Sequence, residues 1–301
     1  MNLKRIAVIG SSNTDMVIKT SKLPSPGETI LGGDFFMNAG GKGANQAVAA
    51  ARLGGNVSLI ARTGDDVFGR QAKKIFDIDK IDTDYMLTDP DHPSGVALIT
   101  VDAQGENCIV VAPGANNYLS KADIEIAMEE ILRSEIILMQ LEIPVETVSY
   151  VAEIAHEAGI KVILNPAPAA RISDELLSML YMITPNETEA ELISGIPVHD
   201  VESAAFAARN LYQRGVNVVI ITLGSKGALL YSGENEIIIP VQKVEAIDTT
   251  AAGDVFNGAI AVAISEGLAL DKAVEFACKA ASISVTRMGA QSSAPYRNEL
   301  E

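Results

Sequence analysis

The segment Val216-Asn217-Val218-Val219-Ile220-Ile221-Thr222-Leu223 carries an unbroken run of β-branched apolar residues at its centre. A strand that is apolar on consecutive positions, and not only on alternate ones, is typical of a sheet covered by helices on both faces. Similar runs recur at Arg5 to Gly10, Val57 to Ala61, Glu135 to Leu141, Lys161 to Leu164 and Tyr181 to Thr184. Together they predict a largely parallel sheet.

Segments with helical periodicity lie between these strands. The clearest are Ala44 to Leu53, Lys121 to Arg133, Val145 to Ala158, Ala204 to Arg214, Asp254 to Ser265 and Asp271 to Thr286. Strands that alternate with helices predict an α/β fold with a doubly wound, largely parallel sheet flanked by helices. Ser120, three residues before Asp123, also predicts a capped start for one of them.

Two stretches, Glu28 to Phe36 and Gly95 to Val111, interrupt this alternation. In the second, Gly105 lies in a polar turn between two alternating apolar runs, which is typical of a hairpin. We expect insertions near residues 16–37 and 94–112 to form a small β-sheet lid that closes over a ligand or packs on a second copy. No linker divides the chain, so residues 1–301 are expected to form a single α/β domain with this lid.

The chain has 39 acidic and 23 basic residues and a net charge of −16. A field of this sign repels nucleic acids and anionic lipid surfaces, and no segment reaches the ~20 apolar residues of a membrane span. The start of the chain lacks the features of a signal peptide. Cys108 and Cys278 lie far apart and signal no thiolate metal site. We expect a cytoplasmic protein that binds neither nucleic acid nor membranes.

A glycine-rich segment, Gly40-Gly41-Lys42-Gly43-Ala44-Asn45-Gln46-Ala47, precedes an apolar helical run. Glycines at a helix start let a ligand approach bare amides, and the helix dipole favours electron-rich oxygens. Lys42 adds a cation, and Asn45 adds a side chain that can donate and accept hydrogen bonds. The spacing differs from that of a Walker P-loop. The segment is either a ligand-binding loop or a tight loop before a packed helix.

Two carboxylates, Asp248 and Asp254, flank a turn of small residues that opens another predicted helix. Gly253 can present unpaired N–H groups to a transferring phosphoryl group, and Asp254 beside it can take a proton from a hydroxyl. An aspartate at a helix start is also a common N-cap. Because one cap does not need two carboxylates, we favour Asp254 as a base.

Two further polar segments follow predicted strands directly. Thr184 to Glu189 offers Asn186 and Glu189 to a hydrated Mg²⁺, and Thr222 to Gly227 offers amides, hydroxyls and Lys226 to nucleotide phosphates. Taken alone, the first segment is more simply explained by acidic residues at a helix dipole, and the second by a strand-to-hairpin turn.

Polar residues also follow other strands, at Asn13, Asp15 and Glu142. Such groups can converge on one crevice and bind sugar hydroxyls. Each residue alone is more often a turn residue or a cap.

In their order along the chain, these motifs resemble those of the ribokinase (PfkB-type) family of carbohydrate kinases. The resemblance spans nearly the whole chain and rests on Gly10 to Asp15, Pro26 to Thr29, Gly40 to Ala47, Met139 to Glu142, Asn165 to Ala169, Thr184 to Glu189 and Asp248 to Gly258. It implies an enzyme that uses ATP to phosphorylate D-ribose at the 5-hydroxyl and gives ribose 5-phosphate. The alternatives are a kinase for 2-deoxyribose or another pentose or ketose, and a non-catalytic sugar- or nucleotide-binding regulator. Asn13 favours ribose, because relatives that prefer 2-deoxyribose tend to carry an apolar residue there.

The resemblance also implies roles for individual residues. The sugar would be bound by Asn13, Asp15, Gly41, Lys42, Asn45 and Glu142, with Asp254 as the general base and Ala252 and Gly253 as anion-hole amides. ATP would be bound by Asn186, Glu189, Thr222, Gly224, Ser225, Lys226, Gly227, Gly253 and Cys278, with Asn186 and Glu189 ordering Mg²⁺. A K⁺ ion would be held by Asp248, Thr250, Ser284, Arg287, Gly289 and Ser293. The lid would pack against its twin in a homodimer.

Overall fold

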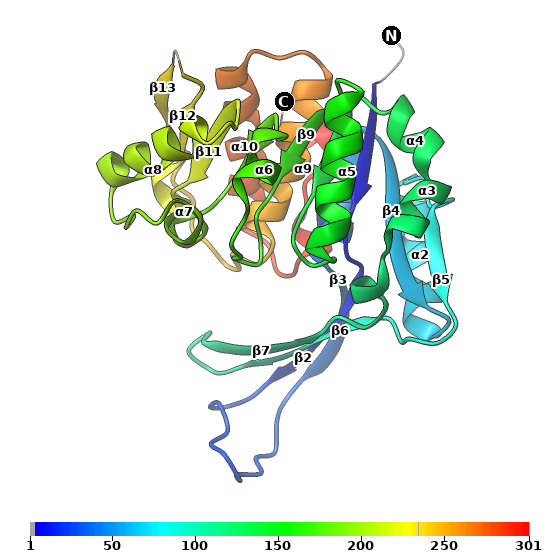
Figure 1. Cartoon of the computed structure of the whole chain (residues 1–301). Helices are drawn as coiled ribbons and strands as arrows, with labels where there is room; N and C mark the ends of the chain where they lie inside the picture. Colours follow the sequence, from blue (N-terminus) through cyan, green and yellow to red (C-terminus); the bar gives the residue numbers. More distant parts are fainter. Residues whose placement is uncertain (1–3, 234, 301) are drawn as a thin grey trace.

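The computed structural model describes residues 4–233 and 235–300, and its main sheet confirms the predicted α/β class (Figure 1). The sheet has nine strands. β1, β4, β5, β8, β9, β10 and β11 are parallel, and β12 and β13 add an antiparallel edge. Their order is β13 (Glu236–Ile239), β12 (Ala228–Tyr231), β11 (Val218–Thr222), β10 (Met182–Ile183), β9 (Lys161–Leu164), β8 (Ile136–Met139), β1 (Arg5–Ile9), β4 (Asn56–Gly64) and β5 (Met86–Asp89).

Helices cover both faces of this sheet, which explains why its strands are apolar on consecutive positions. In β1, Ile6 and Val8 belong to one buried cluster, whereas Ala7 and Ile9 belong to another. The first cluster lies under α1 (Lys42–Arg52), α2 (Val67–Ile78), α9 (Ala252–Ser265) and α10 (Leu270–Ser284). The second lies under α3 (Lys121–Ile126), α4 (Met128–Arg133), α5 (Val145–Glu157), α6 (Asp174–Ser178), α7 (Glu187–Ser194) and α8 (Val201–Gln213). No helix in the described residues is long and apolar enough to cross a membrane.

The six strands predicted for the main sheet are all present, but the helices differ from the prediction. The segment Lys121 to Arg133 forms two helices, because the backbone at Ala127 leaves helical geometry between α3 and α4. The predicted cap of α3 is confirmed by reciprocal hydrogen bonds between Ser120 and Asp123. Helices α2 and α6 were not predicted: in α2 only Gly69 and Phe76 are buried, and α6 is only five residues long.

A second, four-stranded sheet forms the lid, in the order β3 (Phe35–Gly40), β2 (Asn13–Lys19), β6 (Gly95–Val101) and β7 (Asn107–Ala112). It projects below the carboxyl ends of the parallel strands in Figure 1. The hairpin of β6 and β7 was predicted. The strand expected within Glu28 to Phe36 begins only at Phe35, because the prolines and glycines of residues 20–34 form an exposed loop. Its partner β2 starts as early as Asn13, which was expected to follow a strand and not to begin one.

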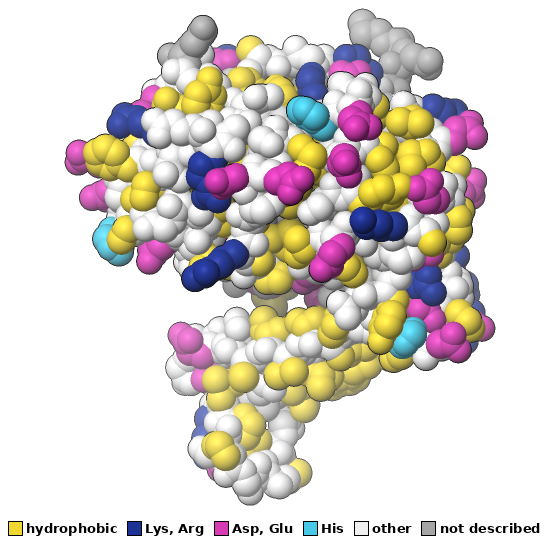
Figure 2. Space-filling model, viewed as in Figure 1, with side chains coloured by type: hydrophobic (Ala, Val, Ile, Leu, Met, Phe, Trp, Pro, Cys, Tyr) yellow, Lys and Arg dark blue, Asp and Glu magenta, His cyan; other side chains and the backbone are white. Residues whose placement is uncertain are grey.

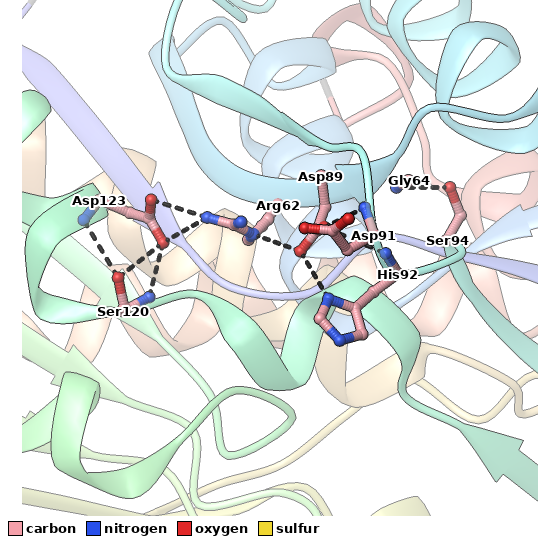
Figure 3. A network of polar contacts seen from close by, with 8 residues as sticks. All are labelled: Arg62, Gly64, Asp89, Asp91, His92, Ser94, Ser120 and Asp123. Atoms are coloured by element: carbon pink, nitrogen blue, oxygen red, sulfur yellow. Dashed lines mark hydrogen bonds and ion pairs between the residues drawn. The ribbon is translucent and has the colours of Figure 1, made fainter.

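The root of the lid is tied to the body by the polar network of Figure 3. Arg62 on β4 donates to Asp89 at the end of β5 (2.8 Å) and to Asp123 on α3 (2.9 and 3.0 Å). Burial alone would raise the pKa of Asp89, but the guanidinium of Arg62 and the N–H groups of Asp91 and His92 hold that pKa well below its usual range. The segment that leads into β6 is therefore anchored.

Candidate active site

Asp254 lies on the third residue of α9 and is buried. Its Oδ2 accepts a hydrogen bond from Asn45 Nδ2 (2.9 Å), and its Oδ1 accepts one from Gln46 Nε2 (3.0 Å). Both donors stand on α1, at the glycine-rich segment singled out in the sequence. Burial raises the pKa of Asp254, whereas Lys42 and the two amide donors oppose that rise. The two amide donors thus hold the side chain of Asp254 in one orientation at a helix start.

A chain of buried amides fixes the orientation of Gln46. Asn165 Nδ2 donates to the backbone carbonyl of Thr184 (3.3 Å), so its Oδ1 must face Gln46. Gln46 therefore presents its Nε2 to both Asn165 and Asp254, and its Oε1 accepts from Gln140. The orientation of all three amides follows from the backbone carbonyl of Thr184, which can only accept a hydrogen bond.

The start of α9 supplies unpaired amides beside this carboxylate. Ala251 has a left-handed backbone (φ 59°), which is uncommon for a residue with a side chain and typical of functional turns. The N–H of Ala252 donates to Thr249 O (3.3 Å). Of the two amides expected to face an anion, only that of Gly253 has no partner among the described residues, and Gly253 is exposed.

The segments expected to bind the sugar converge near Asp254. Glu142 accepts from the Lys42 N–H (3.0 Å) and from Ser11 Oγ (2.6 Å), which joins the ends of β1 and β8 to the start of α1. Gly41, the N-cap of α1, has a positive φ of 88°. A Cβ added there would lie 2.7 Å from the backbone nitrogen of Asn13. The Oδ1 of Asn45 is buried without a partner in the described residues, and such an atom calls for a donor from a ligand or water.

The charges in this region shift one another. Burial alone would lower the pKa of Lys42, but the carboxylates of Asp254, Glu142, Glu189 and Asp15 outweigh it and raise that pKa. Burial, then the charges of Glu142 and Asp254, raises the pKa of Asp15 to about 6. Lys42 therefore stays charged among four acidic residues. Such a cluster of buried charges with shifted pKa values is typical of a functional site.

Replacing Asp15 by asparagine is expected to stabilise the ligand-free protein at neutral pH. Because the pKa of Asp15 is raised to about 6 in the folded protein, its carboxyl group contributes stability below its unfolded pKa of about 3.9. That contribution is lost as the pH rises through about 6, where burying the ionised group becomes unfavourable and a neutral asparagine is not penalised. The free energy of unfolding of the variant should exceed that of the parent by ~1 to 3 kcal/mol at pH 7.5 and by less at pH 4. Urea denaturation without ligands measures both values, and no gain at pH 7.5 would contradict the prediction.

A cavity of about 530 Å³ opens beside the start of α9. Residues expected to bind ATP line it at Thr222, Gly224, Ser225, Gly227, Gly253 and Cys278, together with apolar groups of the segment 241–246 and of α10. Burial raises the pKa of the Cys278 thiol to about 12, so it is a neutral, apolar wall at neutral pH. The segment from Gly224 to Lys226 is a single 3₁₀ turn that joins β11 to antiparallel β12. The segment is therefore a strand-to-hairpin turn, and it also contributes to the cavity wall.

The remaining residues expected at the nucleotide lie around this cavity and not on its wall. Asn186 pairs with Thr222 in an isolated β-bridge, and its side chain and that of Glu189 form a reciprocal cap at the start of α7. The ammonium of Lys226 is exposed and lies 3.5 Å from Glu187. Across the described residues, no three His, Cys, Asp or Glu side chains gather in a way that could hold a metal ion.

The residues expected at a K⁺ ion belong to two neighbouring segments that Asp248 joins. Its Oδ1 accepts from the Thr250 N–H (2.9 Å) and its Oδ2 from the Gly289 N–H (2.8 Å). Ser284 and Ser293 are buried, and each donates its hydroxyl proton to a nearby carbonyl, which leaves oxygen lone pairs for a cation. Carboxylate, carbonyl and hydroxyl oxygens are the ligand type that hard cations take in proteins. The guanidinium of Arg287 pairs with Glu299, so only its backbone can contribute.

Several residues of this region had no assigned role in the sequence. Gln46, Gln140 and Asn165 occur in the motifs that carry the family resemblance, but nothing in their spacing connects them to Asp254. The one feature of the sequence that could have indicated a role is that they are polar residues within segments predicted to be buried. Asn257 is a further example, because it accepts from Thr184 Oγ1 (2.6 Å) and donates to the Gly253 carbonyl (2.8 Å).

Comparison with known proteins agrees with this geometry. The family model for "pfkB family carbohydrate kinase" matches residues 3–297. A ribokinase of Haemophilus influenzae is 47% identical over 98% of this chain and 97% of its own, and a deoxyribokinase of Salmonella typhi is 40% identical over 96% and 95%. The structure of Arabidopsis thaliana ribokinase with ribose and ATP superposes with a TM-score of 0.91 at 33% identity, over 99% of this chain and 97% of that one.

Proposed function

The chain belongs to the pfkB family of carbohydrate kinases, and from that membership we propose that it transfers the γ-phosphoryl group of ATP to the 5-hydroxyl of D-ribose. The observation that carries the proposal is Asp254, buried at the start of α9 beside the Gly253 amide, which has no partner in the described part of the chain. A sugar- or nucleotide-binding protein without chemistry would have no use for a base at this position. The products are ribose 5-phosphate and ADP.

In the proposed reaction, Asp254 accepts the proton of the sugar's primary hydroxyl. The oxygen then forms a bond to the γ-phosphorus, and the bond between that phosphorus and the β–γ bridging oxygen breaks with its electron pair leaving on ADP. Asn45 and Gln46 hold the carboxylate in its accepting orientation, and the Gly253 N–H neutralises charge on the transferring group. Asn13, Asp15, Gly41, Lys42, Asn45 and Glu142 bind the remaining groups of the sugar.

The nucleotide is proposed to occupy the cavity lined by Thr222, Gly224, Ser225, Gly227 and Cys278. Lys226 stands at its rim and can turn from Glu187 towards the phosphates, since both side chains are largely exposed. A Mg²⁺ ion that arrives with ATP keeps most of its waters and needs few protein oxygens, which Asn186 and Glu189 can supply through water. When bound, the metal neutralises phosphate charge in this strongly acidic protein.

The test is a coupled ADP-release assay with Mg·ATP and K⁺ over ribose, 2-deoxyribose, fructose, arabinose and adenosine. The highest kcat/KM with ribose is expected. Higher kcat/KM with 2-deoxyribose would move the assignment to the activity of the Salmonella typhi relative and leave the kinase mechanism in place. No ADP release with any acceptor would overturn the proposal and favour a binding protein.

Activity is expected to depend on a monovalent cation of the size of K⁺. Asp248 and the carbonyls and hydroxyls around it hold the turn that carries Gly253 and Asp254, so the ion acts by fixing that turn. In buffers of equal ionic strength, kcat should be severalfold higher with K⁺ than with Na⁺ alone. The variant Asp248→Asn should lose this difference, and equal rates of the parent protein in both buffers would contradict the proposal.

The lid is proposed to pair with the lid of a second copy. Figure 2 shows hydrophobic side chains gathered along it, and exposed apolar residues occur on all four strands at Ile18, Phe35, Met37, Leu98, Ile109, Val110 and Val111. Leu98→Asp should convert a dimer into a monomer, as measured by light scattering after size exclusion. Ile78→Asp, on an exposed apolar side chain of α2, is the matched control and should change nothing. A parent protein that is monomeric at micromolar concentration would contradict the pairing.

A further inference from the structure

Asn116 is a buried amide at the root of the lid, outside every segment discussed so far. It stands on the 3₁₀ helix η1 (Gly114–Tyr118), and 1% of its surface is exposed. Its Oδ1 accepts from the Ser12 N–H (2.9 Å), and its Nδ2 donates one proton to the Pro113 carbonyl (2.9 Å). These partners are backbone groups with fixed donor or acceptor character, so the amide has one possible orientation.

That orientation dictates the orientation of Asn13. Asn116 Nδ2 also donates to Asn13 Oδ1 (2.7 Å), so the carbonyl end of Asn13 is occupied. Asn13 Nδ2 has no partner within residues 4–233 and 235–300, yet it is not among the atoms sealed from solvent. Asn13 therefore meets a ligand with N–H donors and not with its carbonyl oxygen.

The surroundings hold this pair of amides rigidly. A Cβ added to Gly95 would lie 2.1 Å from Asn13 Oδ1 and 2.3 Å from Asn116 Nδ2, so only glycine leaves room for their hydrogen bond. Helix η1 is itself tied to the segment before β6. The Ala115 N–H donates to Pro93 O (2.8 Å), and the ring of Tyr118 stacks on His92 with centroids 3.5 Å apart. That segment is anchored by the Arg62 network of Figure 3.

We propose that Asn116 is a positioning residue for sugar selectivity, which holds Asn13 so that its amide donates to one hydroxyl of the acceptor sugar. The inference rests on the proposed function, because it needs a sugar beside Asn13. A sugar that lacks this hydroxyl leaves a desolvated N–H without an acceptor, and such a loss costs far more affinity than a missing apolar contact. Selectivity between ribose and 2-deoxyribose is therefore set by a residue that does not touch the sugar.

The test is Asn116→Asp, which preserves size but replaces the fixed donor by an acceptor. The Asn13 amide then turns its Nδ2 towards the new carboxylate and offers its carbonyl to the sugar. We expect kcat/KM for ribose to fall about 10- to 100-fold through KM, the ratio of ribose to 2-deoxyribose kcat/KM to fall towards one, and the KM for ATP to stay unchanged. A purely structural role would lower the melting temperature without changing that ratio.

A double-mutant cycle with Asn13→Ala shows whether Asn116 acts through Asn13. In the Asn13→Ala background, Asn116→Asp should change the selectivity ratio less than about threefold, because the group it positions is gone. Independent, additive effects would overturn the inference. Should Asn116→Asp fail to fold, Gly95→Ala disturbs the same pair from β6 and should also lower the ratio, and an unchanged ratio there would likewise overturn it. If the parent protein phosphorylates no sugar, the proposed function is contradicted. If the parent prefers ribose and the variants keep this preference, only the role of Asn116 is contradicted.

Discussion

Replacing Asp254 by asparagine is expected to lower kcat for sugar phosphorylation by about 10² to 10⁴-fold. The substitution keeps the size of the side chain but removes the site that accepts the proton. It also sets an amide N–H₂ against the donors of Asn45 or Gln46, so the hydrogen-bonded orientation is lost as well. Initial rates at saturating ribose and Mg·ATP measure the effect, and binding of ribose by calorimetry shows that the site still assembles.

Glu130→Gln is the matched control for this experiment. Glu130 is another buried carboxylate, but it binds Arg5 and Ser58 at the amino ends of β1 and β4, at the far end of the strands from Asp254. Its substitution should lower the free energy of unfolding and leave kcat within about twofold. Retention of full activity in the folded Asp254→Asn variant would rule out Asp254 as the base.

Replacing Gly258 by alanine is expected to destabilise the protein by about 1 to 3 kcal/mol or more. In an exposed helix, replacing glycine by alanine would stabilise the protein by about 1 kcal/mol. At Gly258 a steric clash reverses the sign of this change in stability. A Cβ at Gly258 would lie 2.7 Å from Ala49 Cβ and from Gln46 O, where α9 crosses α1. The two helices must separate, and this moves Asn45 and Gln46 away from Asp254. We therefore expect kcat to fall together with stability.

Gly253→Ala serves as the stability control for Gly258→Ala. Gly253 lies on the same helix, and an added Cβ there would meet no atom within 4 Å. Chemical denaturation should show an unfolding free energy equal to or above that of the parent protein. If Gly258→Ala were equally well tolerated, the close crossing of α1 and α9 would not be what holds the base to its donors.

Six central strands of the main sheet could be predicted, because strands that are buried on both faces have continuous apolar runs, whereas the outer strands β5, β12 and β13 were not among the predicted strands. Helix α2 and the break at Ala127 could not be predicted, since one is mostly exposed and the other is a local change of backbone geometry without proline or glycine. The lid strand β2 was missed for a related reason. Only Val17 of its apolar residues is fully buried, so its pattern does not resemble a core strand.

The candidate site was predicted unevenly. Glycines and polar groups at helix starts and strand ends drew attention to Asp254, Lys42 and Glu142, although each alone also fits a cap or a turn, and the structure brings their segments together. The amides Gln46, Asn165 and Asn116 were not given roles, since an amide in a sequence shows neither which end donates nor what it faces. Their orientations follow from fixed backbone partners, several of which come from segments far apart in the chain.

The two halves of the proposed reaction stand on different parts of the molecule. Asn13 and Asp15 belong to lid strand β2, whereas Gly253 and Asp254 belong to helix α9 of the main layer. Changes in β2 can therefore alter the proposed sugar contacts of Asn13 and Asp15 without touching α9, whereas Lys42, Asn45 and Glu142 tie the rest of the sugar site to the main layer.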